Sequence, residues 1–293
     1  MMLIEVAIIG AGPAGIAAAI QCHRQGIDFI LFEQALVGGL LNNAHLVENY
    51  PGFPAGIAGR FLIDKFSRQL SNLAVPVINE QVTQIDFRNN AFSIMTDSET
   101  RQAQYLILAT GTKPVTTELS ISQSLNGRVL YEIIEIIKVT GQQIVIIGAG
   151  DAAFDYALNL GQRNHVIILN RSDQIKCLSL LEKRANANDN IKYLENISVI
   201  GAEKTPAGQI KIACIQSGDN ISIYADYLVF AIGRDPNDAC LSPKLRSCQK
   251  QMIEKGWLYL AGDIANGRYR QTAIAVADGI RAATQIHTLL SSH

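Results

Sequence analysis

Apolar runs that stop at glycine-rich turns recur along this chain, and their spacing indicates two βαβ units. In the first unit, residues 5–9 predict a strand, residues 15–25 a helix and residues 28–33 a second strand that ends in an acid. The second unit begins at Gln143, with a β-branched strand over residues 144–147. Runs of this kind, apolar on both faces, are typical of buried parallel strands.

The rest of the pattern predicts shorter elements between and after these units. The expected helices cover residues 60–73, 152–160 and 272–290, and the expected strands cover residues 82–87, 92–96, 105–111, 165–169, 191–194, 209–216, 221–224, 227–233 and 257–261. Two of the apolar runs stop in the same way, at Gly111 and at Gly233, so the second half of the chain repeats the organisation of the first.

This pattern predicts an α/β fold with two doubly wound Rossmann-type domains, the second inserted in the first. We expect residues 1–114 and 241–293 to form the first domain and residues 115–240 to form the second. A chain of 293 residues is long enough to give each domain a core of its own.

Both glycine-rich turns have the context that dinucleotide binding requires. G-A-G-P-A-G at residues 10–15 and G-A-G-D-A-A at residues 148–153 each follow a strand and open a helix. Such a turn lets the backbone approach a pyrophosphate, which binds the free N–H groups at the start of the helix. Glu33, at the end of the next strand, is placed to accept hydrogen bonds from ribose hydroxyls.

The strand after the second turn ends differently, in Asn170, Arg171 and Ser172. An acid there would favour an unphosphorylated ribose, whereas Arg171 can face a 2′-phosphate. The alternative is that Arg171 is an ordinary solvated side chain.

Composition narrows the class further. The net charge of −1 provides no basic surface for nucleic acid, and no apolar run reaches the length of roughly 18 residues that a membrane helix needs. The five cysteines form no C-x-x-C pair, so neither a disulfide framework nor a metal site is expected. We therefore expect a cytoplasmic protein without membrane or nucleic-acid partners.

The motifs together resemble the thioredoxin-reductase branch of two-domain flavoproteins, and the match runs in order along nearly the whole chain. Besides the two turns and Glu33, the resemblance rests on Gly38-Gly39, E-N-Y-P-G-F at residues 48–53, A-T-G at 109–111, A-I-G-R-D-P-N at 231–237, A-G-D at 261–263 and Arg270-Gln271. It implies FAD in the first domain, NADPH or NADH in the second, and a homodimer.

The resemblance also implies which residues contact each cofactor. For FAD these are Gly10, Gly12, Pro13, Ala14, Gly15, Glu33, Gly39, Leu40, Asn49, Val82, Ala109, Thr110, Gly111, Asp263, Arg270 and Gln271. For the nicotinamide nucleotide they are Gly148, Gly150, Asp151, Ala152, Arg171, Lys176, Ile232 and Gly233. Lys176 ends N-R-S-D-Q-I-K, which keeps two cationic positions of the NADPH-specific H-R-R-x-x-x-R motif.

One departure from the family pattern concerns the chemistry itself. The disulfide reductases of this branch carry C-x-x-C before the second βαβ unit, and counting back from Gly148 places those cysteines on Tyr131 and Ile134. In this region the chain resembles the thioredoxin-reductase-like ferredoxin–NADP reductases, which also carry a tyrosine at the position of Tyr131. The sequence G-A-G-D-A-A-F-D-Y-A-L at residues 148–158 resembles the corresponding segment of the same enzymes.

Some candidate side chains have two interpretations. Tyr131 is either a flavin neighbour or a packed aromatic, and His45 either approaches the flavin or is structurally bonded. Glu132 and Glu135 either relay protons or are solvated.

The resulting prediction is an FAD enzyme that takes hydride from NAD(P)H and passes electrons to an external acceptor, such as ferredoxin or flavodoxin. One alternative is a thioredoxin-reductase relative with displaced or lost thiols, for example at Cys240 and Cys248. Another is a nucleotide-binding flavoprotein without turnover.

Overall fold

The computed structural model describes residues 3–292, which form two compact units. Unit 1 comprises the chain up to Asn42, Val47–Lys113 and the chain from Asp235 onward, and unit 2 comprises Asn43–Leu46 and Pro114–Arg234. The chain therefore leaves unit 1 and returns to it twice. Two short strands at the second passage, β7 (Thr112–Pro114) and β17 (Arg234–Pro236), pair with each other.

The chain returns to unit 1 after Arg234, six residues before residue 240, where the sequence predicts the end of the second domain. The position of this return follows from hydrogen bonds that tie the segment after Arg234 into unit 1. The Asn237 N–H donates to the Gly111 carbonyl at 3.0 Å, and the Ile85 N–H donates to the Cys240 carbonyl at 2.7 Å.

Unit 1 is built on a sheet with strand order β3-β2-β1-β6-β5-β4, in which β18 also pairs with β6. The strands are β1 (Leu3–Ile9), β2 (Phe29–Phe32), β3 (Val77–Ile78), β4 (Val82–Arg88), β5 (Ala91–Thr96), β6 (Thr100–Leu108) and β18 (Leu258–Leu260). The helices are α1 (Pro13–Gln25), α2 (Gly59–Asn72), α5 (Pro243–Ser247), α6 (Gln249–Glu254) and α7 (Thr272–Ser291), with 3₁₀ turns η1 (Gly39–Asn43) and η4 (Gly262–Ile264).

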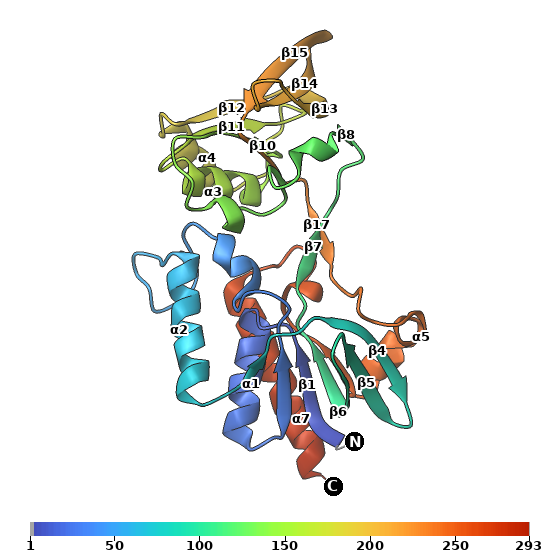
Figure 1. Cartoon of the computed structure of the whole chain (residues 1–293). Helices are drawn as coiled ribbons and strands as arrows, with labels where there is room; N and C mark the ends of the chain where they lie inside the picture. The colour runs from blue at the N-terminus through green and yellow to red at the C-terminus, as the bar shows by residue number, and fades with distance from the viewer. Residues whose placement is uncertain (1–2, 293) are drawn as a thin grey trace. The chain divides into compact units, whose positions relative to one another are not determined.

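The central strand β1 is buried on both faces, which explains its unbroken apolar run. Val6 and Ile8 face a cluster to which α1 and α7 contribute, and these two helices pack side by side (Figure 1). Ala7 and Ile9 face a second cluster that includes residues of α5 and α6. The carboxyl ends of β1, β2 and β6 carry the turns that form the candidate site.

Unit 2 has a parallel sheet of order β12-β11-β10-β16-β9 and a second sheet of order β15-β14-β13-β8 (Figure 1). Its strands are β8 (Ser120–Ile121), β9 (Val129–Leu130), β10 (Gln143–Ile147), β11 (His165–Leu169), β12 (Ile191–Leu194), β13 (Ile197–Lys204), β14 (Ile210–Gln216), β15 (Asp219–Ala225) and β16 (Tyr227–Phe230). Its helices are α3 (Asp151–Leu160) and α4 (Ser179–Asn186), with 3₁₀ turns η2 (Gln123–Leu125) and η3 (Ile134–Ile136).

The parallel sheet of unit 2 also has a covering layer on each face. Phe154 of α3 packs with Ile144 and Ile146 on one face, while Val145 faces the second sheet on the other. Within residues 3–292, no helix has the length and apolar character needed to cross a membrane. The same residues contain no cluster of three or more side chains suited to hold a metal ion.

Candidate dinucleotide sites

The first glycine-rich turn joins β1 to α1, and its glycines serve different needs. Gly10 has a φ of +100°, and a Cβ there would lie 2.5 Å from the Ala109 carbonyl oxygen. A Cβ on Gly15 would overlap the Gly10 carbonyl oxygen. Gly12 is different, because its backbone is extended and a Cβ would meet nothing within 4 Å. The fold itself therefore requires Gly10 and Gly15, whereas Gly12 leaves space open beside the N-terminus of α1, as the approach of a pyrophosphate needs.

Glu33 lies directly across this turn. Its carboxylate accepts the Ala11 N–H at 2.7 Å and the Ala35 N–H at 3.0 Å, and the residue is buried. Each carboxylate oxygen retains a free acceptor position, so the contacts orient Glu33 without using up its capacity for ribose hydroxyls. Gly39 lies beside the same turn, because a Cβ on it would be 3.6 Å from the Gly12 Cα.

The A-T-G segment after β6 closes the other side of the turn. Ala109 is buried against Gly10, and its N–H donates to the Ile9 carbonyl at 2.8 Å. Thr110 Oγ1 donates to the Asn237 carbonyl at 2.5 Å. This hydrogen bond joins the A-T-G segment to Asn237, the last residue of the A-I-G-R-D-P-N motif.

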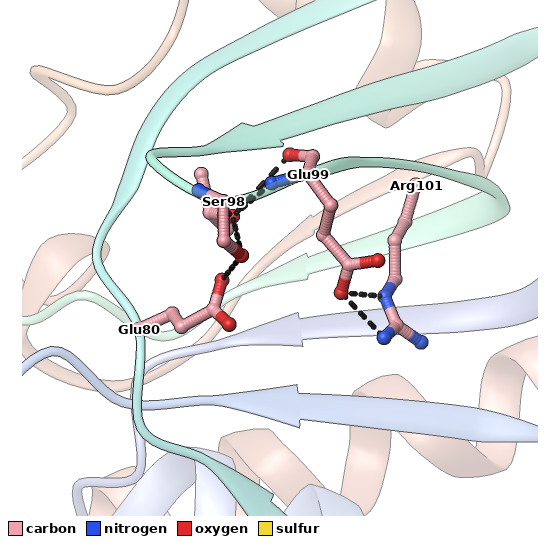
Figure 2. A network of polar contacts seen from close by, with 5 residues as sticks. Glu80, Ser98, Glu99 and Arg101 are labelled. Atoms are coloured by element: carbon pink, nitrogen blue, oxygen red, sulfur yellow. Dashed lines mark hydrogen bonds and ion pairs between the residues drawn. The ribbon is translucent and has the colours of Figure 1, made fainter.

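Val82, expected at the adenine, starts β4 with its side chain buried. The segment before it is fixed at both ends. The Ile78 carbonyl accepts the Glu33 N–H at 2.9 Å, and Glu80 accepts the Ser98 hydroxyl at 2.7 Å. Figure 2 shows this contact together with the neighbouring pair of Glu99 and Arg101, whose Nε donates to Oε1 at 2.6 Å. Hydrogen bonds from Thr96 and Ser98 lower the pKa of Glu80, so this anchor is charged at neutral pH.

Two distant segments of the expected flavin site meet in unit 1. Asn49 Nδ2 donates to Gln271 Oε1 at 2.6 Å, although the residues are 222 positions apart. Asp263 lies in η4, and the glycine before it packs on the start of α1, since a Cβ on Gly262 would lie 2.9 Å from the Ala14 Cβ. Arg270 and Leu40 are both half-buried, and their expected contacts with the flavin stay predictions.

The second turn joins β10 to α3 and repeats the division of roles. A Cβ on Gly148 would overlap the Ala231 carbonyl oxygen, whereas a Cβ on Gly150 would meet nothing within 4 Å. The third small position is Ala153, which is fully buried. Gly233, from the A-I-G motif, accepts the Val115 N–H on its carbonyl at 3.0 Å, and Ile232 is partly exposed.

A loop after β11 is tied to this second turn. Asp151 Oδ1 accepts the Leu178 N–H at 2.8 Å, and the Lys176 N–H donates to the Ala149 carbonyl at 2.9 Å. Arg171 and Lys176 are exposed and form no ion pair among residues 3–292. Both cations are therefore available for an anionic group at the turn.

Asn170 is a residue whose role the sequence did not reveal. It is 6% exposed, and its Nδ2 donates at 2.9 Å both to the Gln174 carbonyl and to the Tyr193 hydroxyl. This side chain, at the position where an acid would bind ribose, shapes the loop that carries Arg171. The sequence signal for this role was the position of Asn170, a polar residue directly after an apolar strand.

Tyr131 has a packing role in unit 2. Its ring stacks on Phe230 with centroids 5.5 Å apart, and its hydroxyl accepts the Thr117 N–H at 3.2 Å. The sequence left open whether Tyr131 is a packed aromatic or a flavin neighbour. The structure shows the packed aromatic, and a role beside the flavin stays a prediction. Ile134, at the other thiol position, begins η3.

Glu132 is not a solvated connector residue, because it forms an ion pair with Arg234 at 2.9 Å. It also accepts the Asn43 amide at 3.4 Å. Burial, followed by the charge of Glu132, raises the pKa of the nearby Tyr156 to about 12. Glu135 is exposed.

Asn43–Leu46, a short segment of unit 2, is anchored on α3. The His45 N–H donates to Asp155 Oδ2 at 3.0 Å, and the Asn159 amide donates to the Asn43 carbonyl at 3.3 Å. The His45 ring lies 3.3 Å from the Gln162 amide, so this histidine is structurally bonded.

Two strand-turn-helix sites of this kind define the class of proteins that bind two dinucleotides. A family model described as pyridine nucleotide-disulphide oxidoreductase matches residues 4–279, and the chain belongs to this family.

The chain is also similar to thioredoxin reductases along most of its length. It is 29% identical to thioredoxin reductase 2 of Arabidopsis thaliana over 311 residues, which covers 95% of this chain and 80% of that protein. Mitochondrial thioredoxin reductase 1 of the same plant is 30% identical over 306 residues, covering 95% and 82%. The crystal structure of Lactococcus lactis thioredoxin reductase matches with a TM-score of 0.86 and 25% identity, covering 99% of this chain and all of that one.

These similarities confirm the predicted α/β fold class and the likeness to thioredoxin reductases. The protein is an FAD-dependent pyridine nucleotide oxidoreductase of a family whose members use FAD and NADPH. The residues that hold each cofactor, as argued above, stay predictions.

Proposed function

We propose that this protein is a thioredoxin-reductase-like flavoenzyme without an internal dithiol, whose reduced flavin passes electrons directly to an external acceptor. The observation that carries the proposal is the pair Tyr131 and Ile134 at the positions where the dithiol is expected. Neither side chain can take part in thiol exchange.

The environments of the cysteines support lost rather than displaced thiols. Within residues 3–292 all five are free. Burial raises the pKa of Cys22 to about 12 and the pKa values of Cys214 and Cys240 to about 11, and it also raises the pKa of Cys177. A thiol attacks disulfides only as the thiolate, so these four are poor nucleophiles at neutral pH.

Cys248 remains as a possible partner for Cys240, eight positions earlier. Its Sγ lies 3.4 Å from both the Lys244 and the Leu245 carbonyl oxygens and donates along its own helical turn. This contact orients the thiol toward the backbone of α5 rather than toward a second sulfur.

The relatives of this chain help to choose between the two candidate functions. They carry the names of thioredoxin reductases, which supports a thioredoxin-reductase relative with lost thiols better than a ferredoxin–NADP reductase. We therefore treat ferredoxin and flavodoxin as candidate acceptors to be tested beside thioredoxin and small oxidants. The cytoplasmic location and the homodimer also stay predictions.

The chain's own residues are proposed to place and orient the cofactors. FAD, when bound, supplies the reactive N5 that accepts hydride. Gly12 and the N-terminus of α1 would receive its pyrophosphate, and Glu33 its ribose. Gly150 and α3 would do the same for the nicotinamide nucleotide, with the exposed Arg171 and Lys176 beside it.

Stopped-flow spectroscopy tests the proposal. NADPH or NADH should bleach the flavin, and the reduced protein should then be reoxidised by at least one acceptor of the panel. A flavin that neither nucleotide bleaches would support a nucleotide-binding protein without turnover. Bleaching without reoxidation by ferredoxin, flavodoxin or thioredoxin would move the acceptor to a small oxidant.

Thioredoxin should not be reduced, and a variant with all five cysteines replaced by serine or alanine should accept hydride and pass on electrons at the parent rate. The reason is that no thiol is needed between flavin and acceptor. Turnover of thioredoxin by the parent, combined with its loss in the cysteine-free variant, would show that a displaced thiol pair is at work.

Arg171→Ala should raise the Michaelis constant for NADPH several-fold and leave that for NADH almost unchanged. An exposed cation contributes only about 1 kcal/mol to binding a 2′-phosphate, so the preference for NADPH should be modest. Lys192→Ala removes an exposed cation of β12 in the same unit and serves as the control. Equal losses for both nucleotides in Arg171→Ala would place this side chain outside the phosphate site.

A further inference from the structure

We propose that Asp278 is a positioning residue that holds the turn carrying Asp263, and this inference rests on the flavin site proposed for unit 1. Asp278 lies in α7, and it is the only acid of that helix. Its side chain is 11% exposed. Oδ2 accepts the Gly262 N–H at 3.2 Å and the Asn266 amide at 2.6 Å, while Oδ1 lies 3.5 Å from Arg281.

The turn around Gly262 is closed by these contacts. The Asn266 amide donates a second hydrogen bond, at 2.9 Å, to the Gly262 carbonyl, and the Ala265 N–H donates to the same oxygen at 2.9 Å. The N–H of Gly262 is held by Asp278, and its carbonyl by Asn266 and Ala265. Both backbone polar groups of Gly262, the residue before Asp263, are therefore fixed by hydrogen bonds.

Asp278 is itself fixed by close packing of α7 on α1. The next residue, Gly279, lies so near α1 that a Cβ on it would overlap the Ala14 carbonyl oxygen. Ala14 belongs to the first turn of α1, where the pyrophosphate is expected to bind. Helix α7 thus packs on that turn through Gly279 and holds the backbone before Asp263 through Asp278, and both of these backbone segments are expected to contact the flavin.

The role of Asp278 depends on an acceptor, because both groups that face Oδ2 are donors. A carboxylate oxygen accepts from both. An asparagine can keep both hydrogen bonds by placing its amide oxygen at the position of Oδ2, whereas an alanine leaves both donors without this acceptor. Arg281, whose side chain is 66% exposed, contacts only the other oxygen.

The test compares Asp278→Ala with Arg281→Gln, which removes the ion pair but leaves both hydrogen bonds to Oδ2. FAD is removed from the full-length proteins, and its dissociation constant and the melting temperature of each apo-protein are measured. We expect Asp278→Ala to raise the dissociation constant about tenfold or more, as the loss of hydrogen bonds to a charged group predicts. Arg281→Gln should stay close to the parent.

A double-mutant cycle with Asp263→Asn separates positioning from general destabilisation. If Asp278 acts through Asp263, the double variant should bind FAD little more weakly than the weaker single variant. A merely structural role would lower the apo melting temperature and multiply the two effects. That result, or an unchanged dissociation constant in Asp278→Ala, would overturn the inference.

Two further outcomes are decisive. If Asp278→Ala fails to fold, Asn266→Ala removes one of the two donors from the other side, and normal FAD affinity in that variant counts against the inference. If the parent protein itself binds no FAD, the proposed function fails. This outcome is distinct from a parent that binds FAD beside an Asp278→Ala variant that binds it equally well.

Discussion

Gly12→Leu should yield a folded, colourless protein that has lost FAD. A Cβ on Gly12 meets no protein atom within 4 Å, and its backbone is extended, so leucine fits the apo-protein. The side chain would then occupy the space beside the N-terminus of α1 in which the pyrophosphate binds. Loss of a glycine cap costs at most about 1 kcal/mol of stability. Flavin absorbance after desalting and FAD titration measure the effect.

The matched control is Gly150→Leu in the second turn, which has the same open surroundings. This variant should keep FAD and lose reduction by either nicotinamide nucleotide. Because a bound ligand stabilises the folded state, Gly12→Leu should melt at the temperature of the parent protein from which FAD was removed. Normal FAD content in Gly12→Leu would place the pyrophosphate elsewhere, and a much lower melting temperature would show that leucine disturbs the fold.

Asp155→Asn should change how stability depends on pH. Burial is the main cause that raises the pKa of Asp155 from 3.8 to about 6, against hydrogen bonds from the His45 and Leu46 N–H groups. The folded protein keeps this proton up to about pH 6, whereas the unfolded chain releases it near 3.8. The contribution to the free energy of unfolding is therefore complete below pH 3.8 and is lost as the pH rises through 6.

An asparagine carries no such titration, so the stability of Asp155→Asn relative to the parent should increase by about 2 kcal/mol between pH 4 and pH 7. Urea unfolding at a series of pH values, followed by circular dichroism, measures this difference. Asp189→Asn, which removes an exposed carboxylate from the same unit, controls for the change in net charge. A difference that does not vary with pH would show that the pKa of Asp155 in the folded protein is not raised above its usual value.

The sequence predicted the elements whose requirements are local. A strand run, a glycine at φ +100° and a helix start lie within fifteen residues at the first turn, so their order could be read directly. Strand β13 was missed because a bulge between Val199 and Gly201 breaks its alternation. Helix α4 was missed because it buries Ala185 alone, while Leu180 stays exposed.

Long-range contacts escaped prediction for a different reason. Nothing in Asn43–Leu46 marks it as part of unit 2, since its anchor Asp155 lies 110 positions further along the chain. The partner of Glu132 is equally remote, and without it the acid resembled an ordinary solvated residue. Residues that match a family motif could be placed from the sequence, whereas residues that hold those motifs in place could not.

The interrupted course of unit 1 has a consequence for biosynthesis. Residues 114–234 of unit 2 leave the ribosome as one stretch, after β1 and α1 of unit 1 and before β18 and α7 of the same unit. The glycine-rich turn of α1 is therefore synthesised well before its packing partner Gly279. A nascent chain carries an incomplete flavin site until α7 has been synthesised, so the complete site is available to the cofactor only after that point.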